Sequence, residues 1–193
     1  SVNQVQLVVH DLRLSERRSQ FYHALYSSSV SYRVISRVTY ERPLTMVANQ
    51  SYDVQLTPFH GPTVALKVMI TPQGRNQTNF LTKYKPASLQ LLNENGSRVT
   101  EVLPEDYIRT FVNPEHSHPD SLYDTKTAEY IIPFGSNLKT SVETGKMTGL
   151  RLINGKENLR IQAGSISGAV SVIIKQYKYH EFNVVGNVPR LNQ

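Results

Sequence analysis

Alternation of apolar and polar residues in the stretch 128–163 constrains the fold more than any other feature of this sequence. Side chains two residues apart fall on the same side of an extended chain, so this pattern is typical of a half-buried strand. The apolar positions that repeat at this spacing are Ala128, Tyr130, Ile132, Phe134, Leu150, Leu152, Leu159, Ile161 and Ala163. Asn154-Gly155 supplies two turn residues that tolerate a positive φ. We therefore expect a strand, a long loop and a hairpin.

The same alternation recurs along most of the remaining chain. Pro43 is expected to end the first of these strands, and the Asn93–Gly96 turn is expected to close a hairpin. In the last strand the apolar phase changes near Lys175-Gln176, which predicts either a β-bulge or a strand whose two halves face different neighbours. The further strands expected from this pattern are 29–42, 52–56, 64–70, the hairpin arms around 89–91 and 99–102, and 168–185.

Helical signals are few and short. Ser15 can cap a helix from Glu16 to Tyr26, whose apolar residues recur at helical spacing. Pro104, followed by two acidic residues, suits the start of one or two further turns. Polar loops are expected at 73–86 and 113–126. Eight or nine strands with so little helix predict an all-β fold, an antiparallel eight-stranded jelly-roll sandwich with one or two short helices.

Length and composition favour one folded domain. The 193 residues are 39% hydrophobic and 19% charged, which is typical of a globular chain. We expect an N-terminal arm and short linking helix at 1–28, and a single barrel with a C-terminal tail at 29–193. Because the chain begins with Ser1 and not with Met, it is expected to be a processed product or a piece of a longer protein.

Cysteine, membrane and charge statistics exclude several classes of function. The chain has no cysteine, which removes disulfides, thiolate zinc sites and cysteine nucleophiles. No apolar run approaches the length of a membrane helix, so a soluble domain is expected. The formal net charge is +6, but only Arg17 and Arg18 form an adjacent basic pair before the strands begin. A dispersed charge favours a solvated basic surface over a site for a polyanion.

The residues most similar to metal ligands lie between Glu115 and Asp120, where His116 and His118 are two positions apart. The segment falls in an expected loop and lacks a third distant histidine, so a polar surface loop is the better interpretation. The glycines at 145 and 149 flank Lys146 without the spacing of a phosphate-binding loop. No catalytic, cofactor-binding or metal-binding residue is predicted.

Groups of residues spread along the chain resemble, in the right order, the C-terminal jelly roll of the double jelly-roll major capsid proteins. This is the lineage of adenovirus hexon, tailless membrane-containing phages and large nucleocytoplasmic DNA viruses. The residues that carry the resemblance are 12–21 with the strand 32–40, Phe59–Pro62 with the strand 64–70, Leu91–Gly96 with Tyr107, Tyr130–Phe134 with Gly145, Gly149–Arg151 and Leu159–Ile161, and Tyr177–Tyr179 through Gly186. Gly61 interrupts the His-Pro pair of the family, and Thr148-Gly149 stand where it has Asn-Phe.

The resemblance implies a structural protein of the virion, assembled inside a host cell. Its partners would be copies of itself, as a trimeric capsomer, and neighbouring capsid proteins, with weak contact to a genome or an internal membrane as a further option. It implies no enzyme activity, no cofactor and no small-molecule substrate. The N-terminal arm, 2–11, would be a candidate for reaching an adjoining barrel.

Two other classes of function fit a β-sandwich. A lectin-like or receptor-binding module would hold a ligand with exposed tyrosines or with the loop of His116 and His118. A cupin-type enzyme would need metal-binding histidines that point inward from strands, whereas most histidines here fall in loops or at strand ends. The enzyme is therefore the least favoured of the three.

Overall fold

The computed structural model describes residues 30–74, 79, 82–116, 128–135, 150–185 and 188–192. The chain divides into two compact units, one of residues 33–180 and one of residues 1–32 with 181–193. The arm and linking helix expected at 1–28 lie outside the described residues, as does the whole 136–149 connection.

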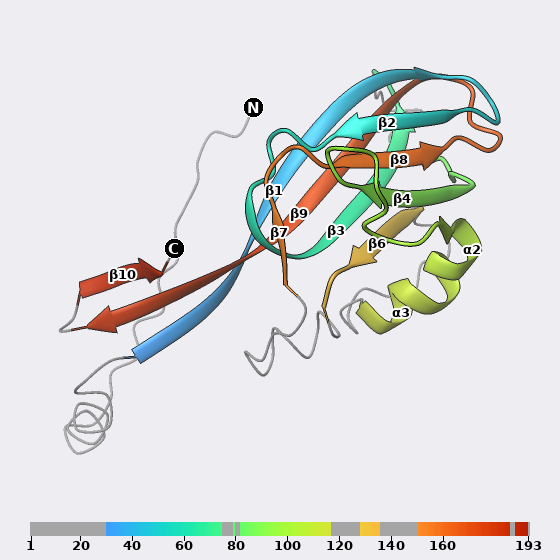
Figure 1. The fold of residues 1–193 in the computed structure, drawn as a ribbon. Coiled ribbons are helices and arrows are strands. Elements are labelled where there is room, and N and C mark those ends of the chain that lie inside the picture. Colours follow the sequence, from blue (N-terminus) through green and yellow to red (C-terminus); the bar gives the residue numbers. More distant parts are fainter. Residues whose placement is uncertain are drawn as a thin grey trace. The chain divides into compact units, whose positions relative to one another are not determined.

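Strands account for most of the described elements (Figure 1). They are β1 (Val30–Met46), β2 (Ser51–Gln55), β3 (Gly61–Pro72), β4 (Ser88–Leu92), β5 (Leu103–Pro104), β6 (Glu129–Pro133), β7 (Arg151–Ile153), β8 (Asn158–Gln162), β9 (Gly168–Val185) and β10 (Val188–Asn192). Three consecutive helical segments join β5 to β6, namely α2 (Glu105–Tyr107), the π-helical η1 (Ile108–Val112) and α3 (Asn113–His116).

The strands form two sheets with the winding of a jelly roll. One sheet has the order β1-β9-β3-β6, with β7 also paired to β3 and β10 to β9, and the other has the order β2-β8-β4-β5. The pairs of known register are antiparallel. The first strand thus lies beside the last long strand of its sheet, and the second lies beside β8 in the other, as in a double Greek key. The expected all-β, antiparallel jelly-roll class is confirmed.

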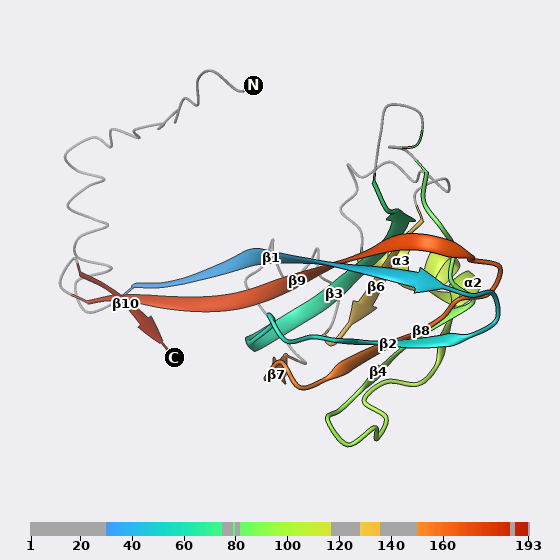
Figure 2. The ribbon, with the colours of Figure 1, turned by 90° about the horizontal axis from the view of Figure 1, so that it is seen from above.

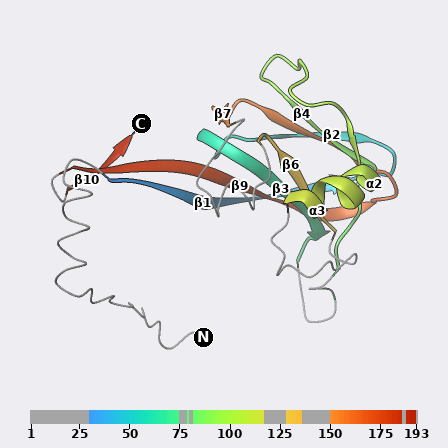
Figure 3. The same ribbon diagram turned by 90° about the horizontal axis from the view of Figure 1, so that it is seen from below.

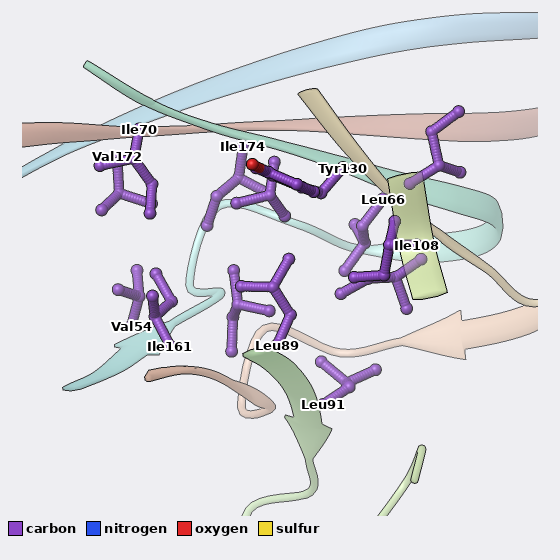
Figure 4. Close-up of a cluster of buried hydrophobic side chains, with 14 of the residues drawn as sticks. Val54, Leu66, Ile70, Leu89, Leu91, Ile108, Tyr130, Ile161, Val172 and Ile174 are labelled. Atoms are coloured by element: carbon purple, nitrogen blue, oxygen red, sulfur yellow. The ribbon is translucent and has the colours of Figure 1, made fainter. Parts of the chain in front are cut away.

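The core lies between the two sheets, which Figure 2 shows as two layers. Strand alternation sends Leu66 and Ile70 of β3 and Ile174 of β9 toward Leu89 and Ile161 of the other sheet (Figure 4). All five side chains are fully or almost fully buried. Burial of such residues is the main favourable term in folding, so the alternating pattern seen in the sequence specifies which faces meet.

The helical segments lie beside β6, as Figure 3 shows from below. The side chain of Asn113 holds them there, because its Nδ2 donates to the carbonyl of Glu129 at 2.5 Å and its Oδ1 accepts from the amide of Ile131 at 3.0 Å. The Tyr130 hydroxyl also donates to Glu105 at 3.3 Å. Asn113 therefore satisfies part of the open edge of β6, which would otherwise expose unpaired backbone groups.

The first strand is longer than the sequence predicts. It continues through Pro43 to Met46, which is buried. β1 is an edge strand of its sheet, and a proline without an N–H is tolerated at an edge. Val38, expected on the core face, is 36% exposed.

The expected hairpin at Asn154-Gly155 is wrong. β7 pairs with β3 in one sheet, whereas β8 pairs with β2 and β4 in the other, so this turn carries the chain between the sheets. The buried carboxylate of Glu157 accepts from the amide of Asn154 at 3.2 Å, and its carbonyl accepts from the amide of Leu56 at 2.9 Å. Only Ile153 of β7 is buried, while Leu150 and Leu152, expected in the core, are exposed.

The irregularity in the last strand also differs in place. β9 keeps one phase through Val170, Val172, Ile174 and Gln176, all of them buried. The register shifts instead on β3, between Thr63 and Ala65. The Nε2 of the inward-pointing Gln176 donates to the hydroxyl of Thr63 at 2.7 Å, which satisfies that buried donor. The Oε1 of the same side chain is buried without a partner among the described residues.

The Asn93–Gly96 turn forms as expected, but the returning arm is not a regular strand. It makes an isolated bridge between Leu92 and Arg98, and the ladder resumes only where β5 pairs with Ser88 and Leu89. The helical turns after it are longer than predicted and end at His116. Pro104 belongs to β5 and precedes the helix.

Candidate interaction surfaces

His116 is part of α3 and not of a loop, which corrects the sequence-based expectation. Its side chain is buried, 7% exposed, and helix formation up to this residue removes it from the polar segment that follows. His118 and Asp120 lie outside the described residues. Among the residues that the structure describes, no three His, Cys, Asp or Glu side chains are placed to hold a metal ion.

Burial makes His116 a pH-dependent element of stability. Burial lowers the pKa of His116 below its usual 6.5, and the charge of Glu115 offsets this only in part. Because the unfolded chain then binds more protons below pH 6.5, stability is present above that pH and falls as the pH drops below it. We expect urea unfolding between pH 7 and 5.5 to show a steeper loss of stability in the wild type than in His116→Gln. Equal slopes would contradict this assignment.

The other two described histidines are His60 and His180. His180 on β9 is hydrogen-bonded to Ser36 on β1 at 2.6 Å, and burial, followed by the charge of Lys178, lowers the pKa of its imidazole. His60 lies against Gly155, where a Cβ would come within 2.8 Å of its ring. A catalytic triad also needs a carboxylate that orients the imidazole, so the Ser36–His180 hydrogen bond by itself does not define one.

A group of basic side chains, which we call the lysine cluster, gathers around one carboxylate. Glu129 of β6 forms ion pairs with Lys67 of β3 and with Lys83, the latter at 3.2 Å. Lys175 of β9 stands opposite Lys67 in the register. Burial lowers the pKa of Lys175. The nearby charge of Glu129 raises this pKa, whereas the positive charges of Lys67, Arg37 and Lys83 lower it further. Burial opposes ionisation of Glu129 too, but hydrogen bonds and charge from the two lysines outweigh it and lower its pKa.

The outer face of the β2-β8-β4 sheet is polar. Arg160 of β8 donates two hydrogen bonds to the carboxylate of Asp53 on β2, both at 2.8 Å. Ser51 and Gln162, at the next position of the same face, also pair. A solvated face of this kind is typical of the outside of a β-sandwich. Exposed ion pairs such as Arg160–Asp53 add little stability to it.

A shallow groove of about 570 Å³ lies where β6 ends and β7 begins. Its exposed lining is both polar and apolar, and two of the lining residues, Leu150 and Leu152, are among the exposed large hydrophobic side chains of the described chain. The lining residues are Val99, Thr100, Pro133, Phe134, Leu150, Arg151 and Leu152. Leu152 is 71% exposed, so this groove is the strongest candidate for contact with another molecule.

Arg151 gives the groove a polar feature. Its Nε is buried without a hydrogen-bond partner among the described residues, and none of the lining residues that the structure describes is a carboxylate. A buried donor without a partner is costly, and such a group calls for an explanation. A carboxylate or phosphate placed in the groove would satisfy the guanidinium.

A second exposed apolar feature lies on the helical segments. The rings of Tyr107 and Phe111 lie 5.6 Å apart at a spacing of four residues, and they are 48% and 63% exposed. Their position on one helical face follows from the helix period. Exposed aromatic pairs are enriched where proteins associate.

Sequence reasoning missed both the lysine cluster and the groove. The cluster joins three strands and a loop, and its only local signal is Lys67 inside an otherwise apolar strand. The groove depends on β7 joining the β3 sheet, which the alternation of Leu150 and Leu152 does not indicate. Gly145–Gly149, named in the sequence analysis, lies outside the described residues. No helix of the described residues is long and apolar enough to span a membrane.

Comparisons with known proteins agree with the fold. No protein-family profile matches the chain, and no curated protein matches it. Solved structures do match. VP54 of PBCV-1, fitted into a reconstruction of the virophage Sputnik, has 11% identity and a TM-score of 0.56 over 93% of this chain and 54% of that one. The quasi-atomic model of the PBCV-1 capsid has 9% identity and a TM-score of 0.53 over 90% of this chain and 54% of that one.

The major capsid protein of Faustovirus is also similar, with 7% identity and a TM-score of 0.58 over 87% of this chain and 36% of that one. The chain therefore spans about half, or less, of the length of these proteins. At such low identity the likeness shows the fold, and it confirms the jelly-roll architecture that the sequence motifs indicated.

Proposed function

We propose that this chain is a structural capsid protein, one jelly-roll barrel of a capsomer that assembles into an icosahedral shell. The observation that carries the proposal is the strand order β1-β9-β3-β6 and β2-β8-β4-β5, together with TM-scores of 0.56 and 0.58 to capsid proteins over about nine-tenths of the chain. In this proposal residues 1–28 form the arm and link, and residues 29–193 form the barrel and its tail.

The surfaces support a role in association. Apolar side chains of the groove and of the Tyr107–Phe111 pair are exposed, and contacts between capsid subunits would cover them. The partners would be copies of this chain, as a trimer, and neighbouring capsid proteins, and the location would be the virion. We propose no catalytic role, cofactor or small-molecule substrate.

The lysine cluster is the place where an anionic genome or membrane would make weak contact, because three lysines there share one carboxylate. The alternative function, a ligand- or receptor-binding sandwich, draws no support from the matched capsid structures. A glycan array would detect the ligand that this alternative requires.

Light scattering of the purified full chain tests the proposal. We expect a concentration-dependent species of roughly three times the 21.9 kDa mass of one chain, and rings of barrels in negative-stain electron microscopy. A chain that stays monomeric at every concentration, both alone and with a second jelly-roll barrel added, would count against the capsid proposal.

A further inference from the structure

We propose that the lysine cluster binds one terminal phosphate group, either inorganic phosphate or a phosphate monoester. The inference deepens the weak anionic contact that belongs to the proposed function, and it rests on that function for its setting. It follows from the charges that the order of the strands places together and from the partial burial of these charges.

Two lysines of the cluster stand directly opposite each other on neighbouring strands. Lys67 of β3 is the register partner of Lys175 of β9. The residues that precede them, Leu66 and Ile174, are fully buried in the core, so both lysines lie on the other face of the sheet. Opposite residues have Cβ atoms about 4.5–5.5 Å apart, and like charges in such a pair are destabilising. An anion bound by both ammonium groups would relieve this repulsion.

Positive charge exceeds negative charge in the cluster. Glu129 pairs with Lys67 through one carboxylate oxygen and with Lys83 through the other. The charge of Arg37, an exposed residue of the adjacent strand β1, also acts on Lys175. Four cationic side chains of the described residues thus lie near this one carboxylate. An ammonium group has three donors, so a lysine paired with Glu129 keeps donors for a second anion.

The cluster is partly withdrawn from water. The side chains of Lys67, Lys83 and Glu129 are 26%, 18% and 24% exposed, and Lys175 is half-buried. Burial, together with the surrounding cations, lowers the pKa of Lys175, which is the response of a cation that lacks sufficient negative charge nearby. Because attraction between charges is stronger where water is partly excluded, an anion is held more firmly here than by an exposed lysine.

Partial burial of the cluster favours a small anion. A phosphate group that projects from its carrier can reach half-buried ammonium groups, and its oxygens accept several charge-assisted hydrogen bonds. Duplex DNA instead presents rows of phosphates, which suit basic side chains exposed along a face. The segment 73–86, which supplies Lys83, has three basic residues and no acidic one, and this charge favours the approach of an anion.

Isothermal titration of the full chain with inorganic phosphate, in chloride buffer of constant ionic strength, tests the inference. Lys175→Gln is expected to weaken binding by about tenfold or more, the range of one hydrogen bond to a charged group. Glu129→Gln removes the competing carboxylate and is expected to tighten binding by about threefold to tenfold, the effect of one nearby charge close to a surface. These opposite signs distinguish a binding site from a general effect of the substitutions on folding.

Lys156→Gln is the matched control. Lys156 is also paired with a carboxylate, that of Glu94, but its side chain is 60% exposed, and its replacement is expected to leave phosphate affinity unchanged. Thermal melting in chloride checks that each variant is folded. A ligand that binds only the native chain raises the melting temperature, so phosphate should stabilise the wild type more than Lys175→Gln.

Equal phosphate affinity of the wild type, Lys175→Gln and Lys156→Gln would overturn the inference, as would a wild type that binds no phosphate. Both results would leave the proposed capsid function standing, because light scattering measures association separately. A chain that binds phosphate through Lys175 but never associates would count against the capsid proposal alone.

Vesicles distinguish the two sources of a terminal phosphate. Phosphatidylcholine vesicles with and without phosphatidic acid are compared by co-sedimentation with the chain. Phosphatidic acid that retains the wild type but not Lys175→Gln would assign the site to a lipid head group, whereas titration with inorganic phosphate but no retention would assign it to free phosphate. Duplex DNA that binds through Lys175 more tightly than either source would overturn the choice of a terminal phosphate.

Discussion

Replacement of Leu159 by alanine is expected to lower the free energy of unfolding by about 2–5 kcal/mol. Leu159 lies in β8, which is flanked by β2 and β4, and its side chain is fully buried. In the register it stands beside Val54 and Leu91, both buried as well. Because neighbours on two strands fix the walls of the site, a cavity left there cannot collapse fully, and the lost contacts add to the transfer term.

The adjacent residue is the matched control for this prediction. Arg160 points to the opposite face of the same strand and makes an exposed ion pair with Asp53. Arg160→Ala removes more atoms than Leu159→Ala, yet we expect a much smaller loss because exposed ion pairs contribute little. Urea unfolding monitored by circular dichroism gives both values. Similar losses for the two variants would mean that β8 is not a central strand of the sandwich.

The part of the fold that could be predicted from the sequence is the part that alternation controls. Leu66, Ile132, Leu159 and Ile161 were expected on core faces, and all are buried. Their strands pair along most of their length, so each strand has one face toward the core and one away from it. Period-2 reasoning is reliable under that condition.

Alternation failed where long-range pairing decides the conformation. β7 has three residues, too few for a period to show its phase. Its orientation comes from pairing with Gly61–Thr63, about ninety positions away in the chain. Leu152 is therefore exposed and Ile153 buried, the reverse of the expectation.

The candidate site depends on these long-range pairings as well. The side chains that line the groove with Arg151, and those of the lysine cluster, come from distant parts of the chain. Pairing of the strands brings them together. Lys67 and Lys175 are 108 positions apart by number, and no local motif connects them. The resemblance to capsid proteins indicated a jelly-roll fold, but it gave no information on a groove that depends on individual side chains.

Gly155→Ala is expected to destabilise the chain by about 3 kcal/mol or more. Gly155 has a φ of +81°, a conformation that costs other residues about 1–2 kcal/mol. A Cβ there would also come within 2.8 Å of the Thr57 carbonyl oxygen and of the His60 ring. The carbonyl belongs to the backbone, so the turn that carries the chain from one sheet to the other would have to shift.

Gly96→Ala separates the two costs. Gly96 has nearly the same φ, +80°, but no atom lies within 4 Å of a Cβ built on it. Its replacement should therefore cost only the conformational part, about 1–2 kcal/mol, and the difference between the two variants in urea unfolding measures the close contact. The double variant His60→Ala/Gly155→Ala divides that contact further, because it relieves the ring and leaves the Thr57 carbonyl. Equal losses for Gly96→Ala and Gly155→Ala would show that the sheet-crossing turn can move without cost.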